Sequence, residues 1–100
     1  MICESGQEYT YDELILGTGL RLQYEKVQGL REALDDPTSH VASIYQLSYA
    51  EKVAKLGERL KSGKAIFTEP ALPIKCAGAP QKILYLWTDK WRQQNLPIDV

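Results

Sequence analysis

The stretch AIFTEPALPIKCAGAP, residues 65–80, carries the strongest fold signal in the chain. Its first four residues, 65–68, combine β-branched and aromatic side chains and predict a short buried strand. Residues 69–79 contain prolines and a glycine, which predict a loop. Pro80 suits the first turn of a helix, where its missing N–H costs nothing. The order strand, loop, helix is typical of a βαβ arrangement and predicts an α/β fold.

Two helices are expected on either side of this loop. Ser48-Tyr49-Ala50-Glu51 has the form of a capping box, and apolar residues then recur every three or four positions up to Leu60. Gly63 favours a left-handed stop after this helix. The second helix would begin with Pro80 in its first turn and run to about Gln93. Its predicted buried face consists of Ile83, Leu84, Trp87 and Trp91.

The first part of the chain has weaker signals. Ser5-Gly6-Gln7 predicts the turn of a short β-hairpin. Leu14-Ile15-Leu16 predicts a buried strand, ended by a tight turn at Gly17-Thr18-Gly19. Residues 20–40 have an irregular pattern and predict a connector with one helical turn near residues 30–34.

Composition excludes several classes of function. The 100 residues include 12 Lys and Arg against 13 Asp and Glu, and 44% are hydrophobic. This is the composition of a small globular domain or of a piece of a larger one, without the basic surface that binds nucleic acid. The longest apolar run, Ile83 to Trp87, is far shorter than the roughly 20 residues of a membrane-spanning helix, and no signal peptide is visible. One histidine and two distant cysteines predict no metal site.

The charge is distributed unevenly along the chain. Residues 1–50 have three basic and eight acidic side chains, whereas residues 51–100 have nine and five. This asymmetry predicts two structural units within the 100 residues.

Cys76 is the candidate reactive residue. It lies four positions before Pro80, so a thiolate there would be stabilised by the unpaired N–H groups of the helix N-terminus and by Lys75 and Lys82. A buried and inert cysteine is the alternative that the residues leave open. The loop lacks the G-x-G-x-x-G pattern that cradles a pyrophosphate, which argues against NAD(P) at this helix.

These residues resemble the sulfide:quinone oxidoreductase family. AIFTEPALPIKCAGAPQKILYL, residues 65–86, is similar to the redox-cysteine loop of that family, and PIKCAGAPQK is a long and specific match. YDELILGTGLRLQYEKVQGL, residues 11–30, resembles the family segment in which a tyrosine–aspartate pair leads a strand into a tight turn. The resemblance extends over most of residues 9–97.

The resemblance implies a fragment of a flavoprotein with two dinucleotide-binding, Rossmann-like domains. In this fragment a short β-hairpin would be followed by a partial βαβ layer. Residues 1–40 would close the first FAD-binding segment and its connector, and residues 41–100 would begin the second domain with the redox-cysteine loop. The parent protein would bind FAD, oxidise sulfide to sulfane sulfur and pass electrons to quinone. It would be attached peripherally to the inner membrane surface of a bacterium or a mitochondrion.

The resemblance also implies roles for individual residues. Cys76 matches one of two redox cysteines, Lys82 matches a lysine near the FAD, and Thr18-Gly19 match the turn that approaches this cofactor. The family's G-x-G-x-x-G, its second redox cysteine, its later FAD contacts and its membrane-associating part have no counterpart here. Gly17 stands where the family often has alanine. We therefore expect a soluble internal fragment that is inactive alone and does not itself hold FAD.

Other functions are compatible with the same residues. The parent could be a flavocytochrome-type sulfide dehydrogenase or another flavin-dependent quinone reductase. A different class is a non-catalytic assembly module, indicated by Trp87, Trp91 and the apolar surface that a partial domain leaves uncovered. Such a surface predicts self-association.

Overall fold

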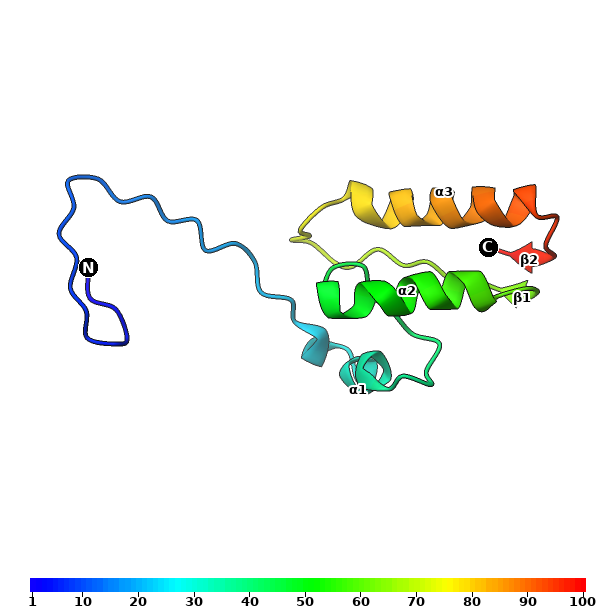
Figure 1. The fold of residues 1–100 in the computed structure, drawn as a ribbon, viewed down its shortest axis with the longest axis horizontal. Helices are drawn as coiled ribbons and strands as arrows, with labels where there is room; N and C mark the ends of the chain where they lie inside the picture. Colours follow the sequence, from blue (N-terminus) through cyan, green and yellow to red (C-terminus); the bar gives the residue numbers. More distant parts are fainter.

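The computed structural model describes all residues from Met1 to Val100. Its elements are, in order, the 3-10 helix η1 (Tyr24–Lys26), α1 (Leu30–Asp35), α2 (Leu47–Arg59), β1 (Gly63–Lys64), α3 (Gly78–Gln93) and β2 (Ile98–Asp99). In Figure 1, α2 and α3 lie alongside each other in a helical body. The residues before η1, 1–23, form an arm that extends away from this body. The molecule measures 61 × 26 × 22 Å, with a radius of gyration of 18.7 Å. A compact chain of this length has a radius near 13 Å, so the arm is extended.

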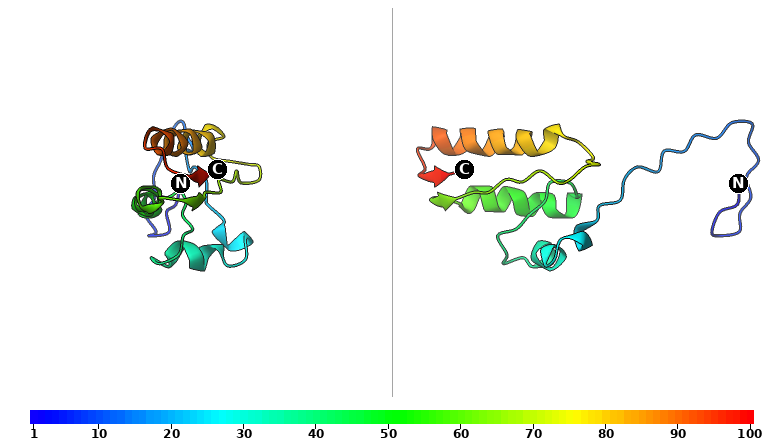
Figure 2. Two further views of the ribbon diagram at one scale, coloured as in Figure 1. Left: turned by 90° about the vertical axis from the view of Figure 1, so that its right-hand side faces the viewer. Right: turned by 180° about the vertical axis from the view of Figure 1, so that it is seen from behind.

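The sheet consists of two short parallel strands joined through α3. Gly63 pairs with Ile98 and Lys64 with Asp99, which makes β1, α3 and β2 a small βαβ unit. Both strands lie at the end of the body that is remote from the arm (Figures 1 and 2). The α/β prediction is therefore confirmed.

The predicted strand over residues 65–68 is wrong, because the strand comes two residues earlier. The Ala65 N–H donates to the Asp99 carbonyl at 2.8 Å, and the ladder ends there since β2 offers no further residue. Ile66 is 80% exposed, while the Phe67 ring lies 6.3 Å from the ring of Trp91. The strand β2 follows Pro97 and is too short to show an alternating pattern, which is why it was not predicted.

The helix α3 agrees closely with its prediction. It begins at Gly78, so Pro80 lies in its first turn and is buried, and it ends at Gln93. The start of α2 differs from the prediction. The helix begins at Leu47, which leaves Ser48 inside it, where its hydroxyl accepts a 2.9 Å hydrogen bond from the Gln46 side chain. The predicted capping box is therefore absent, and no side chain caps α2.

The C-terminal end of α2 also differs from the prediction. The residue after the helix is Leu60, which is extended, and Gly63 adopts its left-handed φ of 104° only at the beginning of β1. Gly63 therefore turns the chain into the strand rather than ending the helix. A left-handed φ is available to glycine without the steric cost that other residues incur.

The contact between α2 and α3 is built on Gly57. The Trp91 indole N–H donates to the Gly57 carbonyl at 2.9 Å, which satisfies one of the carbonyls that the end of a helix leaves unpaired. Trp91 is 4% exposed and stacks on Trp87, with ring centroids 5.7 Å apart. A Cβ atom on Gly57 would overlap the Trp87 ring. The absence of a side chain at Gly57 is thus what lets the two helices approach.

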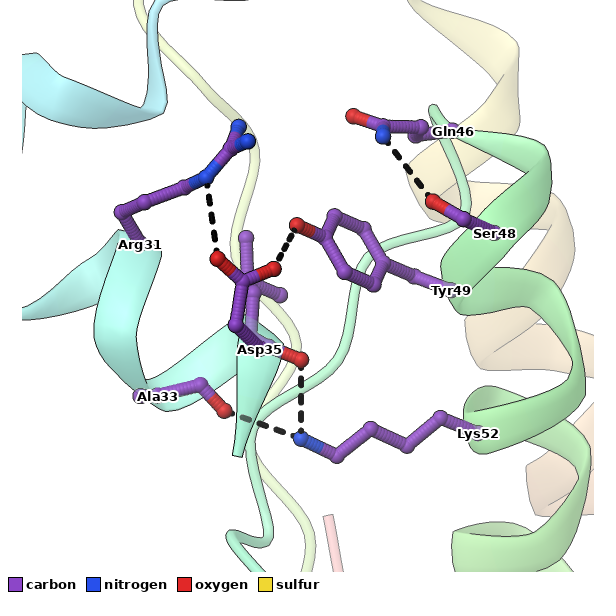
Figure 3. Close-up of polar contacts among 8 residues, drawn as sticks. Arg31, Ala33, Asp35, Gln46, Ser48, Tyr49 and Lys52 are labelled. Carbon is purple, nitrogen blue, oxygen red and sulfur yellow. Dashed lines mark hydrogen bonds and ion pairs between the residues drawn. The ribbon is translucent and has the colours of Figure 1, made fainter. Parts of the chain in front are cut away.

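A second contact attaches α1 to α2, and Figure 3 shows its polar groups. The Tyr49 hydroxyl donates to one oxygen of Asp35 at 2.5 Å, and Arg31 Nε donates to the other at 3.1 Å. Lys52 Nζ donates to the carbonyl of Ala33 at 2.9 Å, among other carbonyls at the end of α1. These bonds satisfy the unpaired carbonyls of a short helix.

The apolar part of the same contact is small. Leu34 is 2% exposed and Tyr49 is also buried. The ring of Tyr24 in η1 meets the ring of Tyr49 edge-on, with centroids 5.9 Å apart. The helical turn predicted near residues 30–34 is confirmed as α1.

The predictions for the arm, a hairpin and a buried strand, are confirmed only in part. The hairpin is reduced to one antiparallel bridge, Ile2 with Glu8, closed by Gly6 at a φ of 81°. The predicted buried strand Leu14-Ile15-Leu16 is wrong: these residues have no strand partner, and Ile15 is 94% exposed. A strand is stabilised by pairing with a neighbour, and the chain supplies none at this position. No helix in the structure combines the length and the apolar character needed to span a bilayer.

Gly57→Ala should destabilise the fold, although alanine is the better helix former. The added methyl group meets the Trp87 ring, and forcing extra volume into a packed contact typically costs about 1–3 kcal/mol. Urea unfolding followed by circular dichroism measures the loss. Gly78→Ala is the matched control, because nothing lies within 4 Å of its Cβ position and stability should not fall. Equal stabilities of the two variants would contradict the role of Gly57.

Tyr49→Phe should weaken the fold in a pH-dependent way. The hydrogen bond from Tyr49 lowers the pKa of Asp35 below 3.8, with smaller contributions from Arg31 and Lys52 opposed by burial. Because the folded value lies below the unfolded one, ionised Asp35 stabilises the fold above pH 3.8, and this stabilisation is lost as the pH falls through the folded pKa. The difference between Tyr49→Phe and the unmodified chain should therefore shrink on acidification.

Urea unfolding midpoints measured across this pH range test the expectation. Tyr11→Phe is the control, since Tyr11 is exposed on the arm. A difference between Tyr49→Phe and the unmodified chain that stays constant at all pH values would contradict the role assigned to Asp35.

Candidate functional site

Cys76 lies immediately before α3, as the sequence indicates. It precedes the N-cap residue Ala77, and its carbonyl accepts a 3.2 Å hydrogen bond from the Ala79 N–H in the first helical turn. Cys76 is exposed and forms no disulfide. Cys76 is therefore not buried within these residues, contrary to that alternative. Cys3, also unpaired, is half-buried in the distant hairpin.

Tyr45, which lies just before α2, is hydrogen-bonded to the loop that carries Cys76. Its hydroxyl donates to the Cys76 carbonyl at 3.0 Å. Burial raises the pKa of Tyr45 above 10.0, and the neighbouring Cys76 and Glu69 raise it further. Tyr45 thus remains a protonated donor at neutral pH. This contact was not predicted, because the partners are 31 positions apart and neither lies in a recognisable motif.

Lys82 lies on α3 shortly after its first turn, and Lys75 lies in the loop beside Cys76. Both lysines are exposed, and neither forms an ion pair with another residue of the chain. The structure therefore brings Cys76 and Lys82 to the same end of one helix. A cation and a helix N-terminus both favour an anion at this position.

Thr18 and Gly19 lie on the arm and are exposed. No hydrogen bond joins either residue to Cys76 or Lys82. The arm and the loop that precedes α3 nevertheless extend from the same end of the body, opposite the two strands (Figures 1 and 2). Within these 100 residues, the candidate cofactor turn and the candidate redox cysteine are on one side of the molecule but not in contact.

The predicted tight turn at Gly17-Thr18-Gly19 is wrong, because the chain has neither a turn nor a bend there, and what the structure shows is an open backbone at Gly19. Its φ is 72°, and nothing lies within 4 Å of its Cβ position. Main-chain groups of residues 10–20 form no hydrogen bonds within the chain, so their amides are available to another partner. The loop before α3 lacks a glycine-rich phosphate cradle. The chain therefore offers a cofactor open main-chain groups on the arm but no phosphate cradle.

Two pockets in the surface lie away from Cys76. A pocket of about 160 Å³ lies beside Gly57 and Trp87, and another of about 250 Å³ lies beside Thr88 and Ile98. Cys76 lines neither pocket. No group of three His, Cys, Asp or Glu side chains is arranged to hold a metal ion. Cys76 is itself exposed and lies outside these two pockets.

Comparison with known proteins identifies the family. No family model and no solved structure matches the chain. The mitochondrial sulfide:quinone oxidoreductase of Schizosaccharomyces pombe is 45% identical over 96 residues, or 96% of the chain. The mitochondrial proteins of the same name from Mus musculus and Dictyostelium discoideum are 46% identical over 83% of the chain and 40% identical over 96% of it. The chain belongs to the sulfide:quinone oxidoreductase family.

The chain matches only a part of each relative. The chain spans about a fifth of the length of these curated relatives, between 18% and 21%. The resemblance to sulfide:quinone oxidoreductases and the expectation of a fragment are thereby confirmed. The roles of Cys76, Lys82, Thr18 and Gly19 remain predictions.

Proposed function

We propose that the parent protein, the longer protein to which this segment corresponds, oxidises sulfide to sulfane sulfur with FAD and passes the electrons to quinone. The observation that carries the proposal is the exposed Cys76 at the N-terminus of α3, in a chain 40–46% identical to proteins named sulfide:quinone oxidoreductase. Sulfide and quinone are accordingly the proposed substrates of the parent.

Cys76 supplies one half of a disulfide whose second cysteine lies outside these residues. Hydrosulfide attacks one sulfur of this disulfide, the S–S bond breaks, and its electron pair leaves with the other cysteine as a thiolate. The new S–S bond makes the attacked cysteine a persulfide. The exposure of Cys76 gives sulfide access to the bond. Cys76 precedes the N-terminus of α3, the end of a helix that favours negative charge, and Lys82 lies on the same helix.

Lys82 from α3 and Thr18 with Gly19 from the arm are the proposed FAD contacts. When bound, FAD supplies a two-electron acceptor between the cysteines and quinone. The exposed main chain around Gly19 allows a flat ring or a phosphate to approach closely. In this arrangement residues 1–40 belong to the first FAD-binding segment, and residues 41–100 begin a second, Rossmann-like domain.

We place the parent at the inner membrane surface of mitochondria, attached peripherally. The three relatives are named as mitochondrial proteins, and quinone is a membrane substrate. The 100-residue chain alone is inactive in this proposal, because it offers one redox cysteine and no phosphate cradle.

Cys76→Ser in the parent should reduce sulfide-dependent quinone reduction by more than about a hundredfold, because the reactive sulfur itself is removed. The flavin absorbance band should persist, since Cys76 is not a proposed FAD contact. Cys3→Ser is the matched control and should retain full activity, because Cys3 lies in the hairpin. Unchanged turnover in Cys76→Ser would refute the proposed role of Cys76. A yellow 100-residue chain that reduces quinone would refute its inactivity.

A second candidate function, an assembly surface, is favoured by the exposed apolar residues. The most exposed of these are Ile15, Leu16, Leu47, Ile66 and Leu72. Side chains of this kind rarely form a run in water without a partner, and Leu14-Ile15-Leu16 forms such a run on the arm. We assign the assembly surface to the run Leu14-Ile15-Leu16, which would pair with another segment of the parent or with a second copy of the chain.

The isolated chain should therefore self-associate, with an average mass that rises with concentration in light scattering. Ile15→Lys should reduce the association, because it places a charge within the apolar run. Leu47→Lys changes an equally exposed residue outside that run and should leave the association intact. A monomer at high concentration would contradict this surface.

A further inference from the structure

The loop that carries Cys76 is hydrogen-bonded to the body at its two ends only, although the Phe67 ring also lies against Trp91. The Ala65 N–H bonds to Asp99 at one end, and the Tyr45 hydroxyl bonds to the Cys76 carbonyl at the other. Residues 66–75 form no hydrogen bond or ion pair with the rest of the chain. The orientation of Cys76 therefore depends on what holds its own carbonyl.

That carbonyl has two donors, and they come from different parts of the fold. The Ala79 N–H belongs to α3 itself, at 3.2 Å, whereas the Tyr45 hydroxyl, at 3.0 Å, precedes α2. A carbonyl oxygen has two lone pairs, so both bonds can form together. Fixing this carbonyl fixes ψ at Cys76 and hence the direction of its Cα–Cβ bond relative to the end of α3.

Tyr45 is itself held in place. Its N–H donates to the Ser43 hydroxyl oxygen at 3.3 Å, and the same oxygen is 2.9 Å from the Tyr24 hydroxyl. Tyr24 lies in η1, the first element after the arm. A hydrogen-bonded chain of Tyr24, Ser43 and Tyr45 thus connects the base of the arm to Cys76.

We propose that Tyr45 is a positioning residue for Cys76. Its hydroxyl holds Cys76 at the N-terminus of α3. Its connection through Ser43 to Tyr24 fixes the loop relative to the base of the arm. The inference rests on the proposed redox role of Cys76. It adds that the two candidate halves of the site, the arm with Thr18 and Gly19 and the loop with Cys76, are aligned by this hydrogen-bonded chain.

Burial supports this assignment. A tyrosine hydroxyl is protonated at neutral pH, and burial raises the pKa of Tyr45 further above 10.0, so this hydroxyl remains a donor. Tyr45 does not contact a reacting atom in the structure, since its bond is to the main chain. Its effect on chemistry is exerted through Cys76.

The test uses the 100-residue chain with Cys3→Ser, so that Cys76 is the only thiol. Tyr45→Phe removes the hydroxyl alone. We expect the Ala79 amide to exchange with deuterium about fivefold faster, the change that corresponds to one lost hydrogen bond of ~1 kcal/mol. We also expect iodoacetamide to alkylate Cys76 about twofold to fivefold more slowly, because the thiol spends less time at the helix N-terminus.

Tyr85→Phe is the matched control, because Tyr85 is exposed on α3. It should change neither rate. In both variants amide exchange within α2 should stay close to the rates of the parental Cys3→Ser chain. This pattern would separate positioning of Cys76 from a general loss of stability, which alters all of these readouts together.

Two results would overturn the proposal: equal exchange and alkylation rates in Tyr45→Phe and Tyr85→Phe, or an acceleration of exchange spread over both long helices. If Tyr45→Phe does not fold, Ser43→Ala removes the anchor of Tyr45 and should produce the same local changes, and their absence would overturn the proposal equally. Neither readout needs FAD, sulfide or quinone. An inactive parent would therefore refute the proposed function and leave this result interpretable.

Discussion

The rest of the structure depends on the contact between Gly57 and the two stacked indoles of α3. Because Gly57 has no side chain, Trp87 packs directly on α2, and Trp91 donates to the Gly57 carbonyl at 2.9 Å. This contact sets the position of α3 along α2. One consequence is that the C-terminal end of α3 returns the chain beside β1, where β2 pairs with it. The other is that the N-terminal end of α3 lies close enough for Tyr45 to reach Cys76.

The remaining parts are attached to this pair of helices mainly by polar bonds. Lys52 and Tyr49 hold α1 through its last carbonyls and Asp35, with only Leu34 fully buried beneath. A contact of this kind relies on hydrogen bonds that are modest individually in water. The arm has even less support, since its hairpin has one bridge and its apolar run has no neighbour. Support from within these residues therefore decreases from the two long helices to the arm.

Whether a sequence prediction succeeded depended on how far apart in the chain the interacting residues lie. Periodicity correctly located α2 and α3, and Pro80 correctly indicated the first turn of α3, because these signals come from residues within one or two turns. The capping box failed because α2 begins at Leu47, which places Ser48 inside the helix instead of at its N-cap. The strand at 65–68 and the buried strand at Leu14-Ile15-Leu16 failed for a shared reason. A strand exists only where a partner is present, and β propensity does not say where that partner is.

The sequence by itself determined the family, the two long helices and the place of a cysteine before the second of them, since each is recorded in consecutive residues. Only the tertiary structure decided that Cys76 is exposed and that Tyr45 holds its carbonyl. It also decided that Gly57 is the point where the helices meet and that β1 pairs with residues at the end of the chain. These facts join residues 31 or more positions apart. Local patterns carry no record of such distances, because they arise only when side chains pack in three dimensions.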